Sequence, residues 1–249
     1  MRMHWWLIGL LGLGCAMPST PDNGTELPPP PPPVAGGGQR LLFVGNSLTY
    51  TWNVPQLVRT LAVAAGKTSP VIVARTTANY ALEDHWNEGT VQRDLREGDY
   101  DVVIVQQGPS TLTSSGDHLT QWVRAFSIAA TAAGTRVGVF AIAAPMGADF
   151  EAGIANYRAA ADLSATAFYP ASQAWLDAWQ LNEAIPLYGA DGFHPSRHGA
   201  ALGAMVIAAL IFEIDPATMP NLFPEFISET EIAQLRLAAD QAIRRDGRR

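Results

Sequence analysis

The sequence predicts an α/β domain, a three-layer α/β/α sandwich around a mostly parallel five-stranded sheet. Short apolar runs rich in β-branched residues recur from residue 40 onward. They are nearly continuous, as in strands that are buried on both faces. Amphipathic helical segments separate these runs, and this alternation is typical of βαβ units. The 249 residues of the chain suffice for one well-buried domain.

The predicted strands are the runs 40–45, 71–74, 100–106, 135–143 and 167–171. After the first strand, apolar residues at helical spacing from Val54 to Ala65 predict a helix, with Pro55 in its first turn and Gly66 at its end. Further helices are expected near 119–134, 154–161, 197–212 and 229–245. The folded domain is therefore assigned to residues 39–249.

The first fifteen residues have the anatomy of an export signal. Arg2 precedes an apolar run from Trp5 to Leu13, and Gly14-Cys15 follows. The run is too short to span a bilayer. The segment resembles a bacterial lipoprotein signal, which implies a signal peptide over residues 1–14 and a lipid on Cys15 after cleavage. An ordinary secretory signal, with a cysteine that happens to lie near the cut, is the alternative.

Residues 15–38 form a linker that is rich in proline and glycine. Six consecutive prolines favour stiff polyproline II, and Gly36–Gly38 end the segment flexibly. Such a spacer would hold a folded domain away from the membrane to which Cys15 is anchored. We therefore expect an exported protein of the bacterial cell envelope, or a secreted or periplasmic one if Cys15 is not modified.

The composition excludes several classes of function. The formal net charge is −7, so the chain lacks the excess of basic residues that is typical of a nucleic-acid-binding protein. With one cysteine, neither an intrachain disulfide nor a cysteine-rich zinc site is expected. The spacing of the five histidines gives no HExxH motif, and no phosphate-binding glycine loop follows the first strand. We expect no metal and no cofactor.

A serine lies two residues beyond the end of the first predicted strand, in the segment FVGNSLTY (43–50). In open α/β sheets, ligands bind outside the carboxyl ends of the strands, which places Ser47 where a reacting group is needed. A serine hydroxyl becomes a nucleophile when a base takes its proton and a carboxylate orients that base. From this segment alone, a helix-capping or turn serine is the better interpretation.

The segment DGFHPS (191–196) supplies the missing base and carboxylate. A turn containing glycine can bring the Asp191 carboxylate to one imidazole nitrogen of His194 and leave the other nitrogen facing outward. Ser196 can cap the helix that follows. The two segments together favour a catalytic set of Ser47, His194 and Asp191.

Gly45–Thr49 and Asp191–Ser196 resemble the first and last blocks of the SGNH (GDSL-type) hydrolases, in a divergent bacterial branch with GNSLT and DGFHPS blocks. The resemblance covers about residues 40 to 215. It implies a flavodoxin-like fold and ester hydrolysis through an acyl-enzyme. Ser47 would be the nucleophile, His194 the base and Asp191 its orienting carboxylate. The family's Gly-Asp-Ser-Leu is Gly-Asn-Ser-Leu here, so Asn46 stands before the nucleophile.

Two middle blocks of this family donate hydrogen bonds to the oxyanion, through a glycine after the second strand and an asparagine after the third. Here the segments TANYALEDHW (77–86) and VQQGPS (105–110) lack that glycine and that asparagine, respectively. The backbone N–H groups of Ser47 and of Ala78 or Asn79 would serve instead, with a side-chain amide from Gln106 or Gln107. Gln107 is favoured because it is nearer the strand end. Each lost donor would cost about 3 kcal/mol of transition-state stabilisation.

Three further residues are candidate substrate contacts: Asn46, His85 and Trp86. For His85 and Trp86, packing inside the domain is an equally open interpretation. The predicted partner is a small-molecule or glycan ester, and the predicted function is that of a serine esterase, such as a carbohydrate acetyl-esterase. A catalytically weakened envelope lipoprotein that binds a glycan or an acylated ligand is the alternative.

Overall fold

The computed structural model describes residues 37–247. Their strands form one five-stranded sheet in the order β2–β1–β3–β4–β5. The strands are β1 (Arg40–Gly45), β2 (Val71–Thr76), β3 (Val102–Val105), β4 (Arg136–Phe140) and β5 (Ala167–Tyr169). All neighbouring strands are parallel. The predicted α/β class and parallel sheet are therefore confirmed, and the strand order is the flavodoxin-like one.

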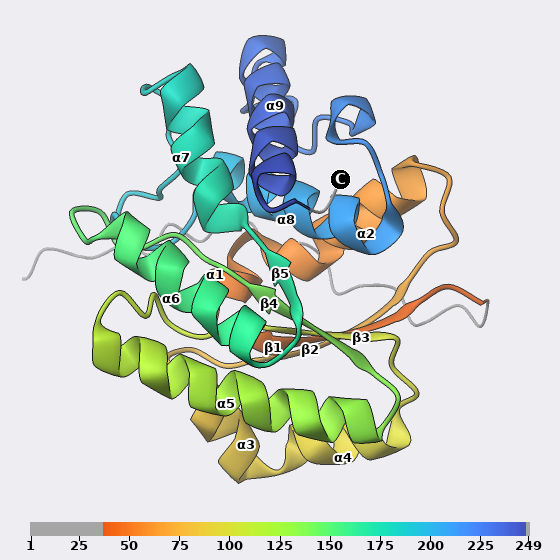
Figure 1. Ribbon diagram of the computed structural model, residues 1–249. Helices are drawn as coiled ribbons and strands as arrows, with labels where there is room; N and C mark the ends of the chain where they lie inside the picture. Colours follow the sequence, from red (N-terminus) through yellow and green to blue (C-terminus); the bar gives the residue numbers. More distant parts are fainter. Residues whose placement is uncertain (1–36, 248–249) are drawn as a thin grey trace, which may run out of the picture.

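Helices cover both faces of this sheet (Figure 1). One face carries α3 (Leu82–Glu88), α4 (Thr90–Glu97), α5 (Thr113–Ala132) and α6 (Phe150–Leu163). The other carries α2 (Val54–Ala64), α7 (Ala171–Leu181), α8 (Arg197–Phe212) and α9 (Glu229–Arg245). Three short elements complete the described part of the chain: α1 (Ser47–Tyr50), η1 (Thr51–Asn53) and η2 (Pro216–Thr218).

The sequence explains the depth at which each element lies. After Arg40, the inner strands β1 and β3 consist of buried apolar residues and glycine, whereas β2 is an edge strand and only partly buried. Nearly every residue of α8 is buried, because α2, α7 and α9 all pack against it. In contrast, α9 is amphipathic and begins at a capping box formed by Ser228 and Glu231.

The topology creates a crevice at one edge of the sheet. Strand order reverses between β1 and β3, and ligands of doubly wound sheets bind beyond the carboxyl ends of the strands at that point. Ser47 follows β1 directly, and Gln106 and Gln107 follow β3. Two predicted functional segments are thus brought side by side although they are far apart in the sequence.

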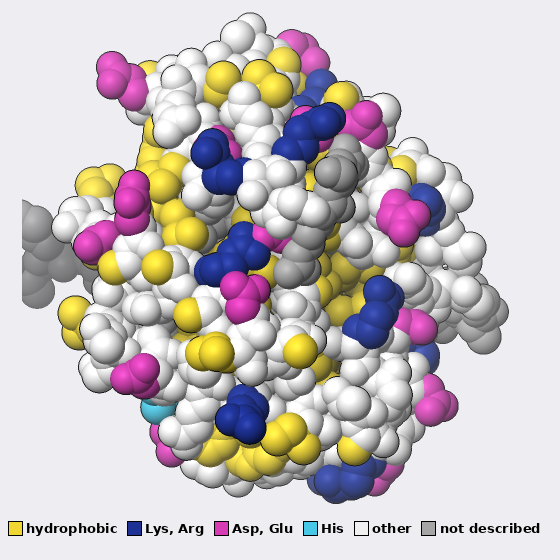
Figure 2. Space-filling model, in the orientation of Figure 1, with side chains coloured by type: hydrophobic (Ala, Val, Ile, Leu, Met, Phe, Trp, Pro, Cys, Tyr) yellow, Lys and Arg dark blue, Asp and Glu magenta, His cyan; other side chains and the backbone are white. Residues whose placement is uncertain are grey.

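The predicted signal peptide, Cys15 and most of the predicted linker lie outside the described residues. Within residues 37–247, no helix is long and apolar enough to cross a membrane. On the face that Figure 2 shows, acidic and basic side chains are interspersed.

Candidate active site

The turn between β1 and α1 holds Ser47. Asn46 is the N-cap of α1, because its side-chain oxygen accepts a hydrogen bond from the backbone N–H of Leu48 at 3.1 Å. Ser47 is the first residue of the helix rather than its cap, so its hydroxyl is available for another contact. Gly45 is required before this turn, since a Cβ there would lie 2.5 Å from Oε1 of Gln106.

The segment before α8 folds into a tight loop that carries the other two predicted catalytic residues. The backbone N–H of Gly189 donates to the His194 carbonyl at 2.8 Å, and that of Ser196 donates to the Leu187 carbonyl at 2.8 Å. Gly192 has φ of 65°, a left-handed conformation that favours glycine. Ser196 then caps α8, as predicted. The loop therefore presents its side chains from a braced backbone.

A chain of hydrogen bonds joins the three residues. His194 Nε2 lies 2.8 Å from the Ser47 hydroxyl oxygen, and His194 Nδ1 lies 2.6 Å from Asp191 Oδ2. With the ring proton on Nδ1, the imidazole donates to the carboxylate and Nε2 accepts from the hydroxyl. This is the arrangement that a base needs in order to deprotonate a serine.

Asp191 is held as a carboxylate. Desolvation raises its pKa, but this effect is outweighed by hydrogen bonds to the charged form, which lower the pKa to about 2. The donors are the ring of His194 and the backbone N–H groups of Phe193 and His194, the latter two at 3.0 and 2.9 Å from Oδ1. One carboxylate oxygen thus fixes the loop while the other orients the imidazole.

Trp52 supports the same loop from the opposite side. Its indole N–H donates to the Pro195 carbonyl at 3.0 Å, next to His194. Its backbone has φ of 57°, which is unusual for a bulky residue. The guanidinium carbon of Arg197 lies 4.1 Å from the Trp52 ring centroid and 3.8 Å from that of Phe226, so this indole is packed as well as hydrogen-bonded.

The two glutamines after β3 point in different directions. Gln106 is buried under the Ser47 turn, where its Oε1 accepts from the Asn46 backbone N–H at 2.9 Å and from the Thr49 hydroxyl at 2.8 Å. Its Nε2 donates to the Gln107 carbonyl. Gln106 is therefore a brace between β3 and α1, and the amide that faces the cleft is that of Gln107.

Beside Ser47 opens a cleft of about 350 Å³. Its lining combines amide and hydroxyl groups with apolar surface and carries no charged side chain: Asn46, Ser47, Asn79, Tyr80, Ala81, Gln107, Gly108, Pro109, Ser110, Ser115 and Phe193. Asn79, with φ of 62°, lines the cleft, whereas Ala78 does not. Among the described residues, no protein acceptor lies within hydrogen-bond distance of the Asn79 backbone N–H.

The Gln107 side chain is only loosely held. Its Oε1 accepts from the Leu82 backbone N–H at 3.3 Å, and its Nε2 is 3.5 Å from the Ser110 hydroxyl. The buried hydroxyl of Tyr157 donates to the Gln107 and Gly108 carbonyls at 2.8 and 2.9 Å, so the backbone here is fixed more firmly than the amide. That amide can exchange its weak contact with Ser110 for a stronger acceptor.

His85 and Trp86 do not line the cleft, so the expected substrate contact through them is not supported. His85 is buried, and its Nε2 is 2.7 Å from the Gly45 carbonyl. Burial lowers its pKa, so the neutral ring donates to that carbonyl. The Trp86 ring packs against Phe126 and Trp122. Asn46 does line the cleft, but its Oδ1 caps α1 and its Nδ2 donates to the Tyr80 carbonyl at 3.0 Å.

Solved structures with the same arrangement of helices and strands identify the fold of this chain. An SGNH hydrolase candidate from Slackia heliotrinireducens superimposes with a TM-score of 0.59 and 24% identity, over 69% of this chain and 97% of that one. The chain has the SGNH hydrolase fold. A DUF4886 family protein from Bacteroides uniformis gives a TM-score of 0.70 and 18% identity, over 83% and 95% of the two chains.

A variant of an acetyl xylan esterase from Geobacillus stearothermophilus shares the SGNH fold with a TM-score of 0.51 and 15% identity, over 72% of this chain and 94% of that one. No protein-family model and no curated protein matches the sequence. Among residues 37–247, no group of three or more histidine, cysteine, aspartate or glutamate side chains is arranged to hold a metal ion.

The sequence did not reveal the residues that brace the site. Gln106 contacts the site from just after β3, Tyr157 from α6 and Trp52 from η1. The contacts of Tyr157 with residue 107 and of Trp52 with residue 195 join positions too far apart in the sequence to leave a local signal. Only the strand alternation of Gln106 and Gln107 indicated that one of the two would turn away from the cleft.

Proposed function

We propose that this chain is a serine esterase that hydrolyses carboxylic esters through an acyl-enzyme. The observation that carries the proposal is the hydrogen-bond chain from Ser47 through His194 to Asp191. It lies at the strand-order reversal, on a fold that also belongs to an acetyl xylan esterase. A structural serine would not need a histidine and an ionised carboxylate in series beside an open cleft.

The geometry supports a two-step reaction. Ser47 Oγ attacks the ester carbonyl while His194 Nε2 takes its proton, and the same proton passes to the departing alcohol oxygen. Water then attacks the acyl-enzyme, giving up a proton to His194, and the carboxylic acid leaves as Ser47 recovers its proton. Asp191 keeps the imidazole in the Nδ1–H tautomer and stabilises the imidazolium of each step.

The negative oxygen of each tetrahedral intermediate needs donors. We assign the backbone N–H groups of Ser47 and Asn79 and the side-chain amide of Gln107, because these residues line the cleft. Ala78, the other backbone candidate, is disfavoured because it does not line the cleft. The missing glycine and asparagine of the two middle blocks motivate the second candidate function, a binding protein for a glycan or acylated ligand with weakened catalysis.

The cleft favours a neutral, hydroxylated alcohol. No lysine or arginine lines it, so it offers no counter-charge to a phosphorylated substrate, whereas its amides, hydroxyls and carbonyls match sugar hydroxyl groups. An acetylated carbohydrate fits this chemistry. We propose further that Cys15 carries a lipid and that residues 15–38 tether the esterase to a bacterial membrane at the cell envelope.

The test uses the full chain with p-nitrophenyl acetate and with acetylated xylan. Ser47→Ala should abolish turnover and labelling by a serine-directed fluorophosphonate. Ser127→Ala should retain both, since Ser127 lies on α5 and is absent from the cleft. A wild-type chain that melts cooperatively yet neither labels nor releases acetate would reject the esterase. Saturable binding of the glycan by that chain would then establish the binding protein.

A further inference from the structure

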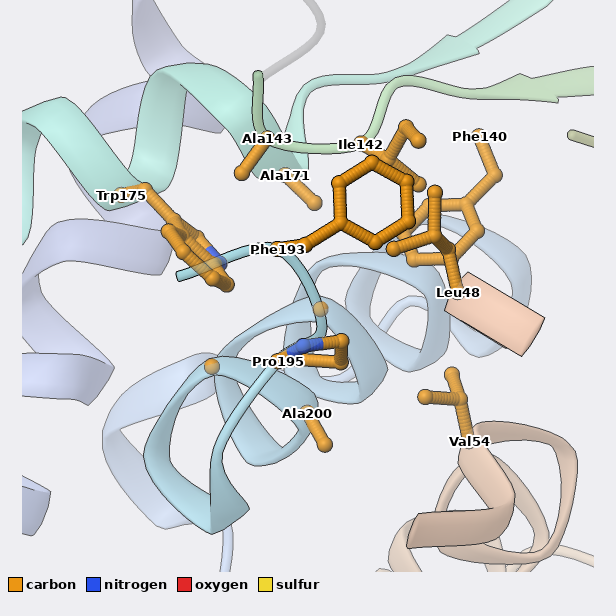
Figure 3. Close-up of a pocket in the computed structure, with 12 residues that line it drawn as sticks. Leu48, Val54, Phe140, Ile142, Ala143, Ala171, Trp175, Phe193, Pro195 and Ala200 are labelled. Atoms are coloured by element: carbon orange, nitrogen blue, oxygen red, sulfur yellow. The ribbon is translucent and has the colours of Figure 1, made fainter. Parts of the chain in front are cut away.

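A second, apolar pocket lies behind the catalytic loop (Figure 3). Its walls come from the end of β4, from α7 and from α8, and include Phe140, Ile142, Ala143, Trp175 and Ala200. Leu48, the residue after Ser47, lines it too. The pocket holds about 20 Å³ of free space, little more than one water-sized group needs. Its walls and size suit a methyl group better than a polar one.

Phe193 separates this pocket from the cleft. It is a lining residue of both spaces, and Figure 3 shows its ring projecting into the pocket near Ile142 and Leu48. The ring also stands edge-on against the His194 imidazole, with centroids 5.0 Å apart. A side chain that lies between the reacting histidine and an apolar pocket can control what enters that pocket.

We propose that the pocket behind Phe193 receives the acyl group and that the Phe193 ring limits its length to about that of acetyl. This inference rests on the proposed esterase function and deepens it. The cleft, which offers the amide and hydroxyl groups that the pocket behind Phe193 lacks, would then hold the alcohol. With the ring in place only a methyl-sized space remains, and longer acyl chains are excluded by volume.

Truncation of the ring should lengthen the accepted acyl chain. Phe193→Ala keeps the backbone N–H that donates a hydrogen bond to Asp191 Oδ1, and it adds the volume of the ring to the pocket. Each methylene that becomes buried favours binding by about fourfold. The ratio of kcat/KM for p-nitrophenyl hexanoate to that for the acetate should therefore rise at least about tenfold.

Two further variants make the experiment specific. Leu163→Ala, a truncation of an exposed apolar side chain on α6 that lines neither space, should leave the ratio at the wild-type value. Phe193→Ala combined with Ala143→Leu refills the pocket from the segment after β4 and should cancel the gain. Phe193→Leu, a smaller truncation, should raise the ratio to a lesser extent and serves if Phe193→Ala does not fold, which thermal melting will show.

The ratio of kcat/KM for the hexanoate to that for the acetate distinguishes failure of the acyl assignment from failure of the esterase proposal. Wild-type turnover of acetate with an unchanged ratio in folded Phe193→Ala and Phe193→Leu would overturn the acyl assignment and leave the esterase intact. A gain that persists after Ala143→Leu would also overturn it, because the longer chain would then lie in the cleft. If the wild-type chain neither turns over acetate nor labels with fluorophosphonate, the esterase itself fails and the acyl assignment falls with it.

Discussion

The two sides of the candidate site differ in how firmly they are built. On the triad side, the catalytic atoms of Ser47, His194 and Asp191 have partners within 3.0 Å, and the loop that carries two of them is closed by backbone hydrogen bonds. On the oxyanion side, the Asn79 N–H has no protein acceptor among the described residues, and the Gln107 amide is 3.5 Å from its partner.

This difference is what catalysis requires. The nucleophile and base must be oriented before substrate arrives, so their hydrogen bonds are already made. The oxyanion donors must instead remain available for a charge that exists only in the transition state. The side with well-matched sequence blocks is also the side with satisfied geometry. In the proposed esterase, the altered middle blocks would still supply oxyanion donors, and the experiments below test that contrast.

The largest effect is expected from Asp191→Asn. Asparagine can still accept the Phe193 and His194 backbone N–H groups through its oxygen, but its amide nitrogen would then face His194 Nδ1. That contact favours the tautomer with the proton on Nε2, which cannot take a proton from Ser47. We expect kcat to fall about 10⁴-fold with little change in KM. Steady-state kinetics on p-nitrophenyl acetate measure this.

The next largest effect separates the two glutamines. Gln107→Ala removes the proposed oxyanion amide and should lower kcat about 10²- to 10³-fold, with a small change in melting temperature. Gln106→Ala removes the brace under Asn46 and leaves a buried backbone N–H without its acceptor. The unfolding free energy should then fall by about 1–3 kcal/mol.

Kinetics and thermal melting of both variants decide the assignment. An unchanged kcat in a folded Gln107→Ala chain would remove this amide from the oxyanion hole and leave only backbone donors. A Gln107→Asn variant that recovers part of the lost rate would identify the amide itself, rather than side-chain volume, as the contributing group.

Trp52→Phe tests whether the hydrogen bond from the Trp52 indole helps to hold the loop that carries Asp191 and His194. The change keeps an aromatic ring for Arg197 but removes the N–H that reaches the Pro195 carbonyl. We expect kcat to fall up to about tenfold and the unfolding free energy to fall by about 1 kcal/mol, because one part-buried hydrogen bond is lost next to His194. Trp86→Phe, in which the indole packs away from the cleft, is the matched control and should keep the wild-type kcat.

Much of this organisation could be predicted from the sequence, for identifiable reasons. The strand at 40–45 and the helices at 197–212 and 229–245 end at the predicted residues, because apolar runs and caps such as Ser196 and Ser228 are local signals. Parallel-sheet topology places Ser47 and the residues after β3 at one edge, where strand ends meet. The 191–196 loop instead lies between α7 and α8 and reaches Ser47 from there.

The supports of the site could not be predicted in the same way. His85 had two equal interpretations, and only its burial and its bond to the Gly45 carbonyl favour packing. The gating position of Phe193 depends on residues from β4, α7 and α8 that converge behind one loop. Periodicity shows which face of an element is buried but not which distant side chain it meets.

The smallest expected effect concerns pH and again distinguishes the triad side. The pKa of Asp191 is lowered in the folded chain to about 2, so the carboxylate contributes stability at every pH above its unfolded pKa of about 3.8. That contribution is lost as the pH falls from about 4 to about 2. The side chain is half exposed, so solvent screening holds the contribution below about 1 kcal/mol.

Melting curves of the wild type and Asp191→Asn between pH 2 and pH 7 test this effect. The wild type should melt at a slightly higher temperature near pH 7, and the two curves should approach each other as the pH falls to about 2, where the carboxylate is protonated in the unfolded chain and about half protonated in the folded one. A difference that does not change with pH would mean that Asp191 acts through its neutral backbone contacts alone. The lowered pKa also keeps Asp191 ionised above about pH 4, so any loss of activity at higher pH values must come from another group.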